Sequence, residues 1–180
     1  MAIFDPYPKG MSLKEIYTKK FTFLRCVILF IGVISLINGV LQLFGVDVFL
    51  PCTAQLTYLL ANCSAEALSN GEMVKFILAL IVYLLCGLAY IVLGLMSKVK
   101  KSLVYYATAF FVVDCLAMFI DLDSVTMTCI ICHVLGLIVF VKGAIETKKY
   151  IKIEQEYLIS KANKTGEKPF DAYPFMFSGK

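Results

Sequence analysis

Four apolar stretches, each close to the length of a membrane-spanning helix, constrain the fold of this chain most. A hydrocarbon layer about 30 Å thick requires about 20 apolar residues in a helix that rises about 1.5 Å per residue. The stretches cover residues 26–46, 76–96, 103–120 and 125–145. Because backbone groups in lipid must be satisfied within each separate segment, each stretch is expected to be α-helical.

The composition agrees with lipid as the solvent of these stretches. Hydrophobic residues make up 60% of the 180 residues, and the mean hydropathy is +0.83, whereas the apolar share of soluble domains is roughly 45–50%. Four spans use most of the chain, so no separate catalytic domain is expected. The sequence predicts an all-α integral membrane four-helix antiparallel bundle, formed by a segment 1–25, a membrane domain 26–146 and a tail 147–180.

The distribution of basic residues predicts the orientation. Sixteen of the seventeen Lys and Arg residues lie before the first stretch, between the second and third, or at and after the end of the fourth; Lys75 is the exception. The opposite loops carry acidic residues, namely Asp47, Glu66, Glu72, Asp121 and Asp123. The positive-inside bias therefore predicts that both termini are cytoplasmic, in a multi-pass plasma membrane protein. The partners that we expect are the lipid bilayer, other membrane proteins or further copies of the chain, and no nucleic acid, because the lysines flank apolar runs.

Two segments outside the predicted spans carry helix signals. In the outer loop 47–75, Pro51 is suited to start a helix and Asn70-Gly71 to stop it, which predicts a helix lying on the outer membrane surface. Beyond Lys148, apolar residues recur near helical spacing as far as Asn163, which predicts a short cytoplasmic extension of the fourth span. The aromatic-rich segment 169–180 is expected to dock on the membrane or on a partner.

Polar side chains recur at a similar depth in three predicted spans. Asn38 and His133 lie about 12 Å from the outer boundary and Asp114 about 9 Å, from the helical rise. Since ionised side chains are costly in hydrocarbon and turn toward the bundle interior, we expect Asp114 to face His133, with Asn38 and Gln42 close by. Two interpretations are open: contacts worth about 1 kcal/mol each that fix the packing, or a site that carries a proton or binds a cation or small polar ligand.

A CxxC motif, Cys129-Ile130-Ile131-Cys132, lies at the predicted outer end of the fourth span. In such a motif the first thiol can attack a disulfide and the second can resolve the intermediate. Cys52 and Cys63 in the preceding outer loop offer a second pair. A helix between them would hold its ends about 16 Å apart, whereas a disulfide joins Cα atoms less than about 7 Å apart. The helix and the disulfide therefore exclude each other.

The CxxC motif, the topology and the loop cysteines resemble vitamin K epoxide reductase and its bacterial relatives. This resemblance implies a four-span bundle in which a loop pair, Cys52 and Cys63, passes electrons to a membrane pair, Cys129 and Cys132, beside a quinone. The ten residues between Cys52 and Cys63 exceed the usual spacing of that family.

The stretch from Ile31 to Glu156 resembles a second group, the small four-span membrane proteins of clostridial and related bacteria, which have no assigned activity. The matching segments are VISLINGVLQLFG, LIVYLLCGLAYIVLGLMSK, FFVVDCLAMF and CHVLGLIVFVKGAIETKK. The resemblance gives Asp114 and His133 counterparts in that group, whereas a CxxC is not part of its pattern.

Other enzyme motifs are missing: the sequence has no phosphate-binding loop, no HExxH and no GxSxG. Neither a cofactor nor a metal is expected. The sequence alone favours a non-enzymatic membrane component, with a structural or regulatory role or as a sensor of a small ligand. A thiol–disulfide oxidoreductase that uses Cys129 and Cys132 is the second hypothesis, and a small transporter or channel subunit centred on Asp114 and His133 is the third.

Overall fold

The chain folds into five α-helices, and the part described contains no β-strand. The computed structural model describes residues 10–46, 50, 52–120 and 125–165. The all-helical class is therefore confirmed, with the four apolar helices and a helix in the predicted outer loop. In chain order the helices are α1 (Leu13–Leu43), α2 (Gln55–Ser69), α3 (Met73–Met96), α4 (Leu103–Ala117) and α5 (Met127–Thr165).

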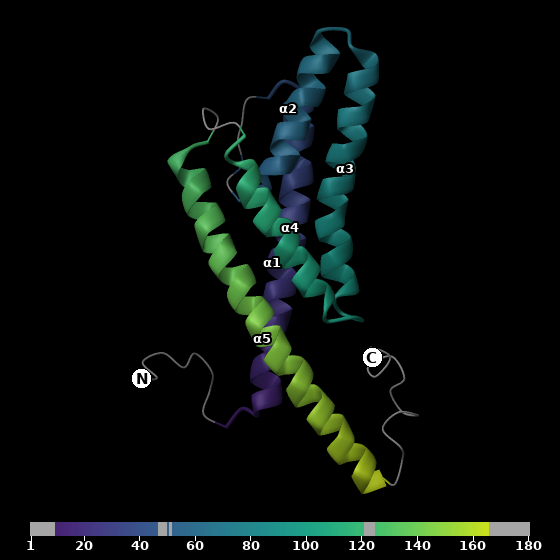
Figure 1. Cartoon of the computed structure of the whole chain (residues 1–180), viewed down its shortest axis with the longest axis vertical. Helices are drawn as coiled ribbons and strands as arrows, with labels where there is room; N and C mark the ends of the chain where they lie inside the picture. The colour runs from purple at the N-terminus through teal and green to yellow at the C-terminus, as the bar shows by residue number, and fades with distance from the viewer. Residues whose placement is uncertain (1–9, 47–49, 51, 121–124, 166–180) are drawn as a thin grey trace.

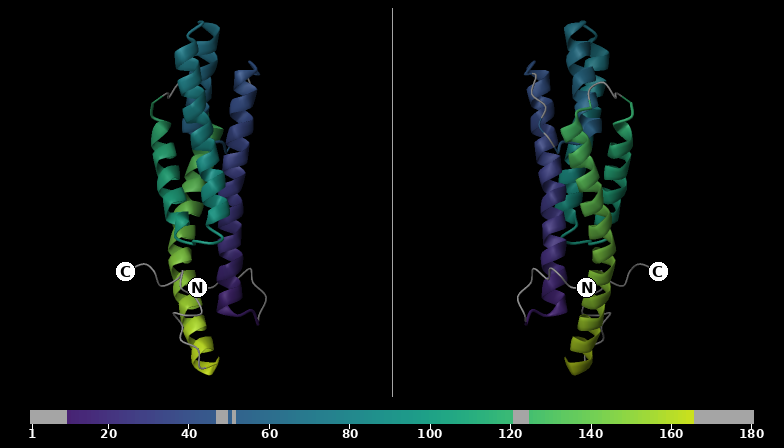
Figure 2. Two further views of the ribbon diagram at one scale, coloured as in Figure 1. Left: turned by 90° about the vertical axis from the view of Figure 1, so that its right-hand side faces the viewer. Right: turned by 90° about the vertical axis from the view of Figure 1, so that its left-hand side faces the viewer.

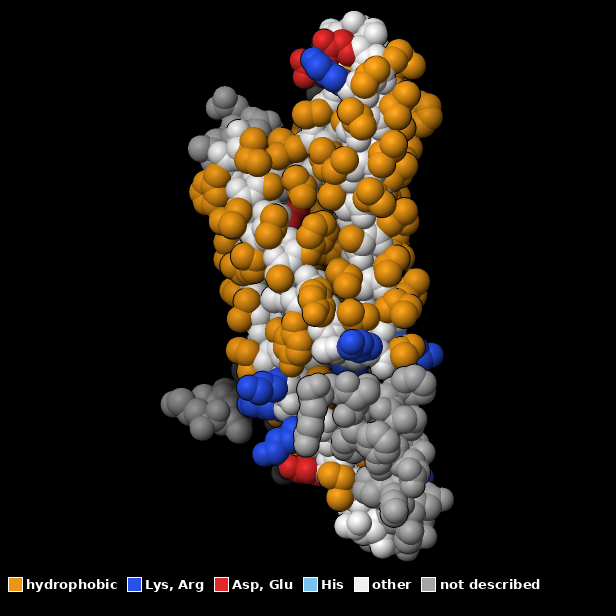
Figure 3. All heavy atoms as spheres, turned by 45° about the vertical axis from the view of Figure 1, so that its right-hand side comes forward, with side chains coloured by type: hydrophobic (Ala, Val, Ile, Leu, Met, Phe, Trp, Pro, Cys, Tyr) orange, Lys and Arg blue, Asp and Glu red, His pale blue; other side chains and the backbone are white. Residues whose placement is uncertain are grey.

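Three of the helices, α1, α3 and α5, are long and apolar enough to cross a membrane, whereas α4 has 15 residues. At the helical rise, α4 covers about 22 Å. On the face that Figure 3 shows, hydrophobic side chains cover most of the long sides of the helices, and most charged side chains lie toward the two ends. The fold is thus compatible with a membrane protein.

The first and last helices define the long axis of the molecule. The start of α1 and the end of α5 lie at the same end, which we call the terminal end (Figures 1 and 2). The α2–α3 turn at Asn70 and Gly71 lies at the opposite end, which we call the turn end. At the terminal end α5 continues to Thr165, so the predicted helical extension is present; segment 169–180 lies outside the described residues.

Contacts across the terminal end fix the extension of α5. Lys20 Nζ of α1 lies 2.9 Å from Glu146 Oε1, and Lys101 Nζ, just before α4, lies 2.7 Å from Glu154 Oε2. The buried ring of Tyr150 packs on Phe21, with ring centroids 5.4 Å apart. These contacts hold α5 against α1 and the start of α4, and so fix how α5 lies along the bundle.

The position of α2 is the main departure from the sequence-based prediction. The start of α2 lies partway along the bundle, and the helix rises from there to the turn end (Figures 1 and 2). It packs lengthwise along α3, which is long enough to span a membrane, and against α1. The predicted helix is therefore present, and it packs into the bundle beside α1 and α3. Pro51 lies outside the described residues.

The polar side chains that α2 buries in the bundle are accommodated at little cost. Gln55, Thr57 and Ser64 are fully buried on the face of α2 that packs inward. The Thr57 hydroxyl donates to the Ala54 carbonyl at 2.6 Å, and the Ser64 hydroxyl donates to the Leu60 carbonyl at 2.8 Å. Because these hydroxyls are satisfied by their own backbone, their burial carries little cost.

Glycines spaced seven residues apart bring α1 and α3 close together. Gly32 and Gly39 lie on one face of α1, and Gly87 and Gly94 lie on the facing side of α3, since seven residues are close to two helical turns. Each glycine lies beneath a side chain of the other helix, such as Tyr83 above Gly39 or Leu36 above Gly87. Small residues allow helix backbones to approach closely. This packing places the polar residues of α1 against the centre of the bundle.

Candidate functional site

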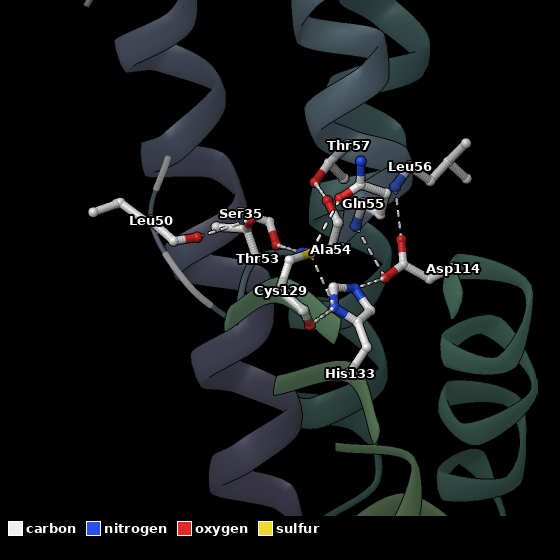
Figure 4. A network of polar contacts seen from close by, with 10 residues as sticks. All are labelled: Ser35, Leu50, Thr53, Ala54, Gln55, Leu56, Thr57, Asp114, Cys129 and His133. Carbon is white, nitrogen blue, oxygen red and sulfur yellow. Dashed lines mark hydrogen bonds and ion pairs between the residues drawn. The ribbon is translucent and has the colours of Figure 1, made fainter. Parts of the chain in front are cut away.

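Asp114 of α4 lies at the buried start of α2 (Figure 4). Its carboxylate accepts hydrogen bonds from the backbone N–H groups of Gln55, at 3.1 Å, and Leu56, at 2.8 Å. The first N–H groups of a helix have no partner within the helix, and they carry a partial positive charge that favours an anion. Asp114 therefore caps α2 from a different helix.

Polar side chains of α1 hold the segment that leads into α2. Asn38 Oδ1 accepts the Leu50 N–H at 2.9 Å, and Ser35 Oγ accepts the Ala54 N–H at 2.8 Å. Asn38 thus holds the segment that leads into α2. Gln42 lies one turn further along α1, near its C-terminal end, where its carbonyl accepts the Gly45 N–H.

The expected contact between Asp114 and His133 is present. His133 Nε2 lies 3.3 Å from Asp114 Oδ2, and both side chains are buried. The two atoms are not aligned as a well-formed hydrogen bond, so the attraction is mainly electrostatic. The imidazole also stacks on Phe111, which stacks on Phe140. The ring orientation is thus fixed by packing on its face and by Asp114 at its edge.

His133 also contacts the CxxC motif, which joins two features that the sequence analysis treated separately. His133 Nδ1 lies 3.4 Å from Cys129 Sγ and 2.9 Å from the Cys129 carbonyl oxygen. Gln55 Oε1 lies 3.5 Å from the same sulfur. The sequence held a signal for this contact, because residues four apart lie on one face of a helix.

Cys52 lies against the second cysteine of the motif. Cys52 Sγ is 3.2 Å from Cys132 Sγ, although 80 positions separate the two residues. Cys52 is exposed and has a φ of +68°, and no other non-glycine residue in the described part of the chain has a positive φ. A left-handed backbone costs an L-residue about 1–3 kcal/mol, and such strain is typical of functional positions.

The loop pair of Cys52 and Cys63, which the resemblance implies, is not bonded in the structure, where both cysteines are free. Cys63 lies on α2, exposed and eight residues beyond its start at Gln55. The helix thus carries Cys63 about 12 Å from the start of α2. Of the two alternatives that the sequence left open, the helix is the one that the fold contains.

Cys132 has two possible disulfide partners in this arrangement. On one side is Cys52, and on the other is Cys129, three residues earlier in α5. Cα atoms three residues apart in a helix are about 5 Å apart, within the range of about 4.4–6.8 Å found for disulfides. The site can therefore pass a disulfide from one pair of sulfurs to the other. Among the described residues, no group of three or more His, Cys, Asp or Glu has the arrangement of a metal site.

The comparisons with known proteins return no relative of this chain. No family model, no curated protein and no solved structure matches it.

Proposed function

We propose that this chain is a membrane thiol–disulfide oxidoreductase that exchanges disulfides with external substrates through Cys52. The contact between Cys52 Sγ and Cys132 Sγ, 3.2 Å, carries the proposal. A disulfide bond is about 2.05 Å long, so a small displacement of a side chain would join these atoms. The sequence alone favours a non-enzymatic role; the contact, and the shared site of Cys129, His133 and Asp114, support the redox hypothesis instead.

The proposed reaction begins with a disulfide between Cys129 and Cys132. The Cys52 thiolate attacks Cys132 Sγ, the Cys52–Cys132 bond forms, and Cys129 leaves with the electron pair and gains a proton. A substrate thiolate then attacks Cys52, which releases Cys132, and a second substrate thiol displaces Cys52. Two substrate thiols have then lost two electrons and two protons and become a disulfide, and Cys129 and Cys132 are reduced.

The reduced pair needs an acceptor of two electrons and two protons to become a disulfide again. The resemblance to vitamin K epoxide reductase implies a lipid-soluble quinone, which would leave as the quinol.

The proposal places the turn end outside the plasma membrane and the terminal end in the cytoplasm. Lys98, Lys100 and Lys101 lie in the α3–α4 turn, on the same side as the lysines of the α5 extension, whereas Glu66 and Glu72 lie near the turn end. Disulfides persist in oxidising compartments, which agrees with Cys52 exchanging from the outer side. In this arrangement α1, α3, α4 and α5 form the four-helix antiparallel bundle, with α4 as a short fourth span and α2 re-entering between them.

A reporter protein fused to the carboxyl end is expected to remain in the cytoplasm. A fluorescent protein that matures only in the cytoplasm should be bright at this position, and a phosphatase that is active only outside should be silent. The same two reporters inserted at Gly71 should give the reverse pattern, because this glycine lies at the turn end. Phosphatase activity at the carboxyl end would contradict the proposed orientation.

Replacing Cys129 with Ser is expected to trap a disulfide between Cys52 and Cys132. The variant lacks the thiol that displaces Cys52 from Cys132, so the intermediate should accumulate on mild oxidation with diamide. Mass spectrometry of peptides from the purified chain in detergent, without reductant, would detect the cross-link.

Two variants serve as controls for this trap. Cys63→Ser in the Cys129→Ser background should leave the yield unchanged, because Cys63 is exposed on α2 away from the site. Cys132→Ser should abolish the cross-link. If Cys52 remained a thiol in the Cys129→Ser chain under conditions that oxidise small dithiols, the proposed function would be contradicted.

A further inference from the structure

We propose that Cys129, His133 and Asp114 form a proton relay, in which His133 takes the thiol proton of Cys129 when this sulfur attacks Cys132. The inference rests on the proposed function and deepens it by assigning a base to the buried half of the site. His133 is then a catalytic residue, because its ring nitrogen contacts the reacting sulfur. Asp114 is a positioning residue, because it acts through His133.

The contact with Asp114 determines which ring nitrogen carries the proton. The Asp114 carboxylate already accepts two backbone N–H groups, one at each oxygen. An ionised carboxylate accepts hydrogen bonds and donates none. The negative charge beside Nε2, at 3.3 Å, favours the tautomer of the neutral ring whose proton is on Nε2, although no aligned hydrogen bond joins the two atoms. This assignment leaves the lone pair of Nδ1 available, as in the Ser-His-Asp arrangement of hydrolases.

The free nitrogen faces the thiol that must lose a proton. His133 Nδ1 lies 3.4 Å from Cys129 Sγ, a normal distance for a thiol that donates to nitrogen. Once Nδ1 is protonated, its new N–H can donate to the Cys129 carbonyl oxygen at 2.9 Å. The carbonyl repels the lone pair of the neutral ring but stabilises the protonated ring. The surroundings of Nδ1 thus favour the transfer of the proton.

Burial gives this proton few other acceptors. The exposed fraction is 1% for Cys129 and 4% for His133, so bulk water does not reach the thiol. The other polar side chain that the structure describes beside this sulfur is Gln55, whose amide oxygen is a very weak base. A carboxylate at Nε2 also stabilises the positive charge that forms on the ring.

The relay balances in both directions of exchange. Starting from the Cys52–Cys132 disulfide, the Cys129 proton moves to His133 Nδ1, the Cys129–Cys132 bond forms, and the Cys52–Cys132 bond breaks. Cys52 leaves as a thiolate and gains a proton from solvent, because it is exposed. In the reverse direction, His133 returns its proton to Cys129 as this sulfur leaves. No oxidant or reductant is consumed in this step.

The test follows this exchange in the purified chain in detergent, with Cys26, Cys63, Cys86 and Cys115 replaced by Ala. The probe 4,4′-dithiodipyridine first forms a mixed disulfide at the exposed Cys52. Cys132 then displaces the pyridine thiol and forms the Cys52–Cys132 disulfide, and Cys129 converts it to the Cys129–Cys132 disulfide. Acid quenching and peptide mass spectrometry give the amount of each disulfide at each time.

His133→Gln is the informative variant, because Gln keeps a polar side chain in the site but cannot take the proton. The final step is expected to slow by about 100-fold, the lower range for a general base, in both His133→Gln and His133→Ala. Formation of the Cys52–Cys132 disulfide should keep its normal rate, which also shows that the variants are folded. In the unsubstituted site, the final step should be slower in deuterium oxide, a response that a purely packing role would not give.

The outcomes separate the relay from the proposed function. The relay would be overturned if the His133→Gln variant formed the Cys129–Cys132 disulfide as fast as the chain with His133. This holds whatever the rate in His133→Ala. The relay would also be overturned if, with His133 in place, the Cys129–Cys132 disulfide formed at the same rate in deuterium oxide as in water. This measurement does not depend on the folding of a variant. If the Cys52–Cys132 disulfide never formed with His133 in place, the proposed function itself would fail.

Discussion

Replacing Asp114 with Ala is expected to lower the free energy of unfolding by about 2–6 kcal/mol, because two buried backbone donors lose their acceptor. The carboxylate accepts hydrogen bonds from the N–H groups of Gln55 and Leu56, the first two residues of α2. It also lies beside His133. Without it, the buried N–H groups of Gln55 and Leu56 lose their acceptors, at about 1–3 kcal/mol each. Denaturant unfolding of the chain in one detergent, followed by circular dichroism, would measure the change.

Two further substitutions in α4 make this result specific. Asp114→Asn should cost less, because its amide oxygen still accepts one backbone N–H. Thr108→Val should have little effect, because the Thr108 hydroxyl bonds only to the Val104 carbonyl within its own helix. If Asp114→Ala unfolded at the same denaturant concentration as the original chain, Asp114 would not be the cap that holds α2 inside the bundle.

The long helices and the contact between Asp114 and His133 could be predicted from the sequence. Both follow from the free-energy cost of placing polar groups in an apolar medium. The stretch predicted over 76–96 becomes α3, Met73–Met96, since length and uniform apolarity fix such a helix almost alone. Asp114 and His133 lie in contact because each lowers the free-energy cost of burying the other. The depth of a residue in a span follows from its position in the sequence and the rise per residue, and the similar depths of Asp114 and His133 predicted their contact.

The entry of α2 into the bundle could not be predicted in this way. Its start is held by Ser35 of α1 and by Asp114 of α4, which are 19 and 59 positions away from the backbone groups that they bind. A local pattern cannot contain such partners, so Pro51 and Asn70-Gly71 predicted a helix on the outer membrane surface. The contact between Cys52 and Cys132 depends on this entry, and for that reason the sequence did not predict it.

The glycine contacts between α1 and α3 lead to the last prediction, because they position the α1 residues that anchor α2. Gly39→Ala would place a methyl group against the ring of Tyr83, whose hydroxyl donates to the Leu36 carbonyl and resists displacement. Overpacking of this kind costs about 1–3 kcal/mol. We expect an equal loss of unfolding free energy in detergent. A lower yield of the Cys52–Cys132 cross-link should accompany it, since Ser35 and Asn38 move with α1.

Val40 supplies the matched control, because it is the next residue of α1 and is exposed. Val40→Ala leaves the contact with α3 intact, so the unfolding free energy and the cross-link yield should both stay close to those of the original chain. Tyr83→Ala combined with Gly39→Ala should cost less than the sum of the two single changes, because the removed ring makes room for the methyl group. Strict additivity would mean that Gly39 and Tyr83 do not contact each other. The position of the cysteine site would then not depend on how closely α1 approaches α3.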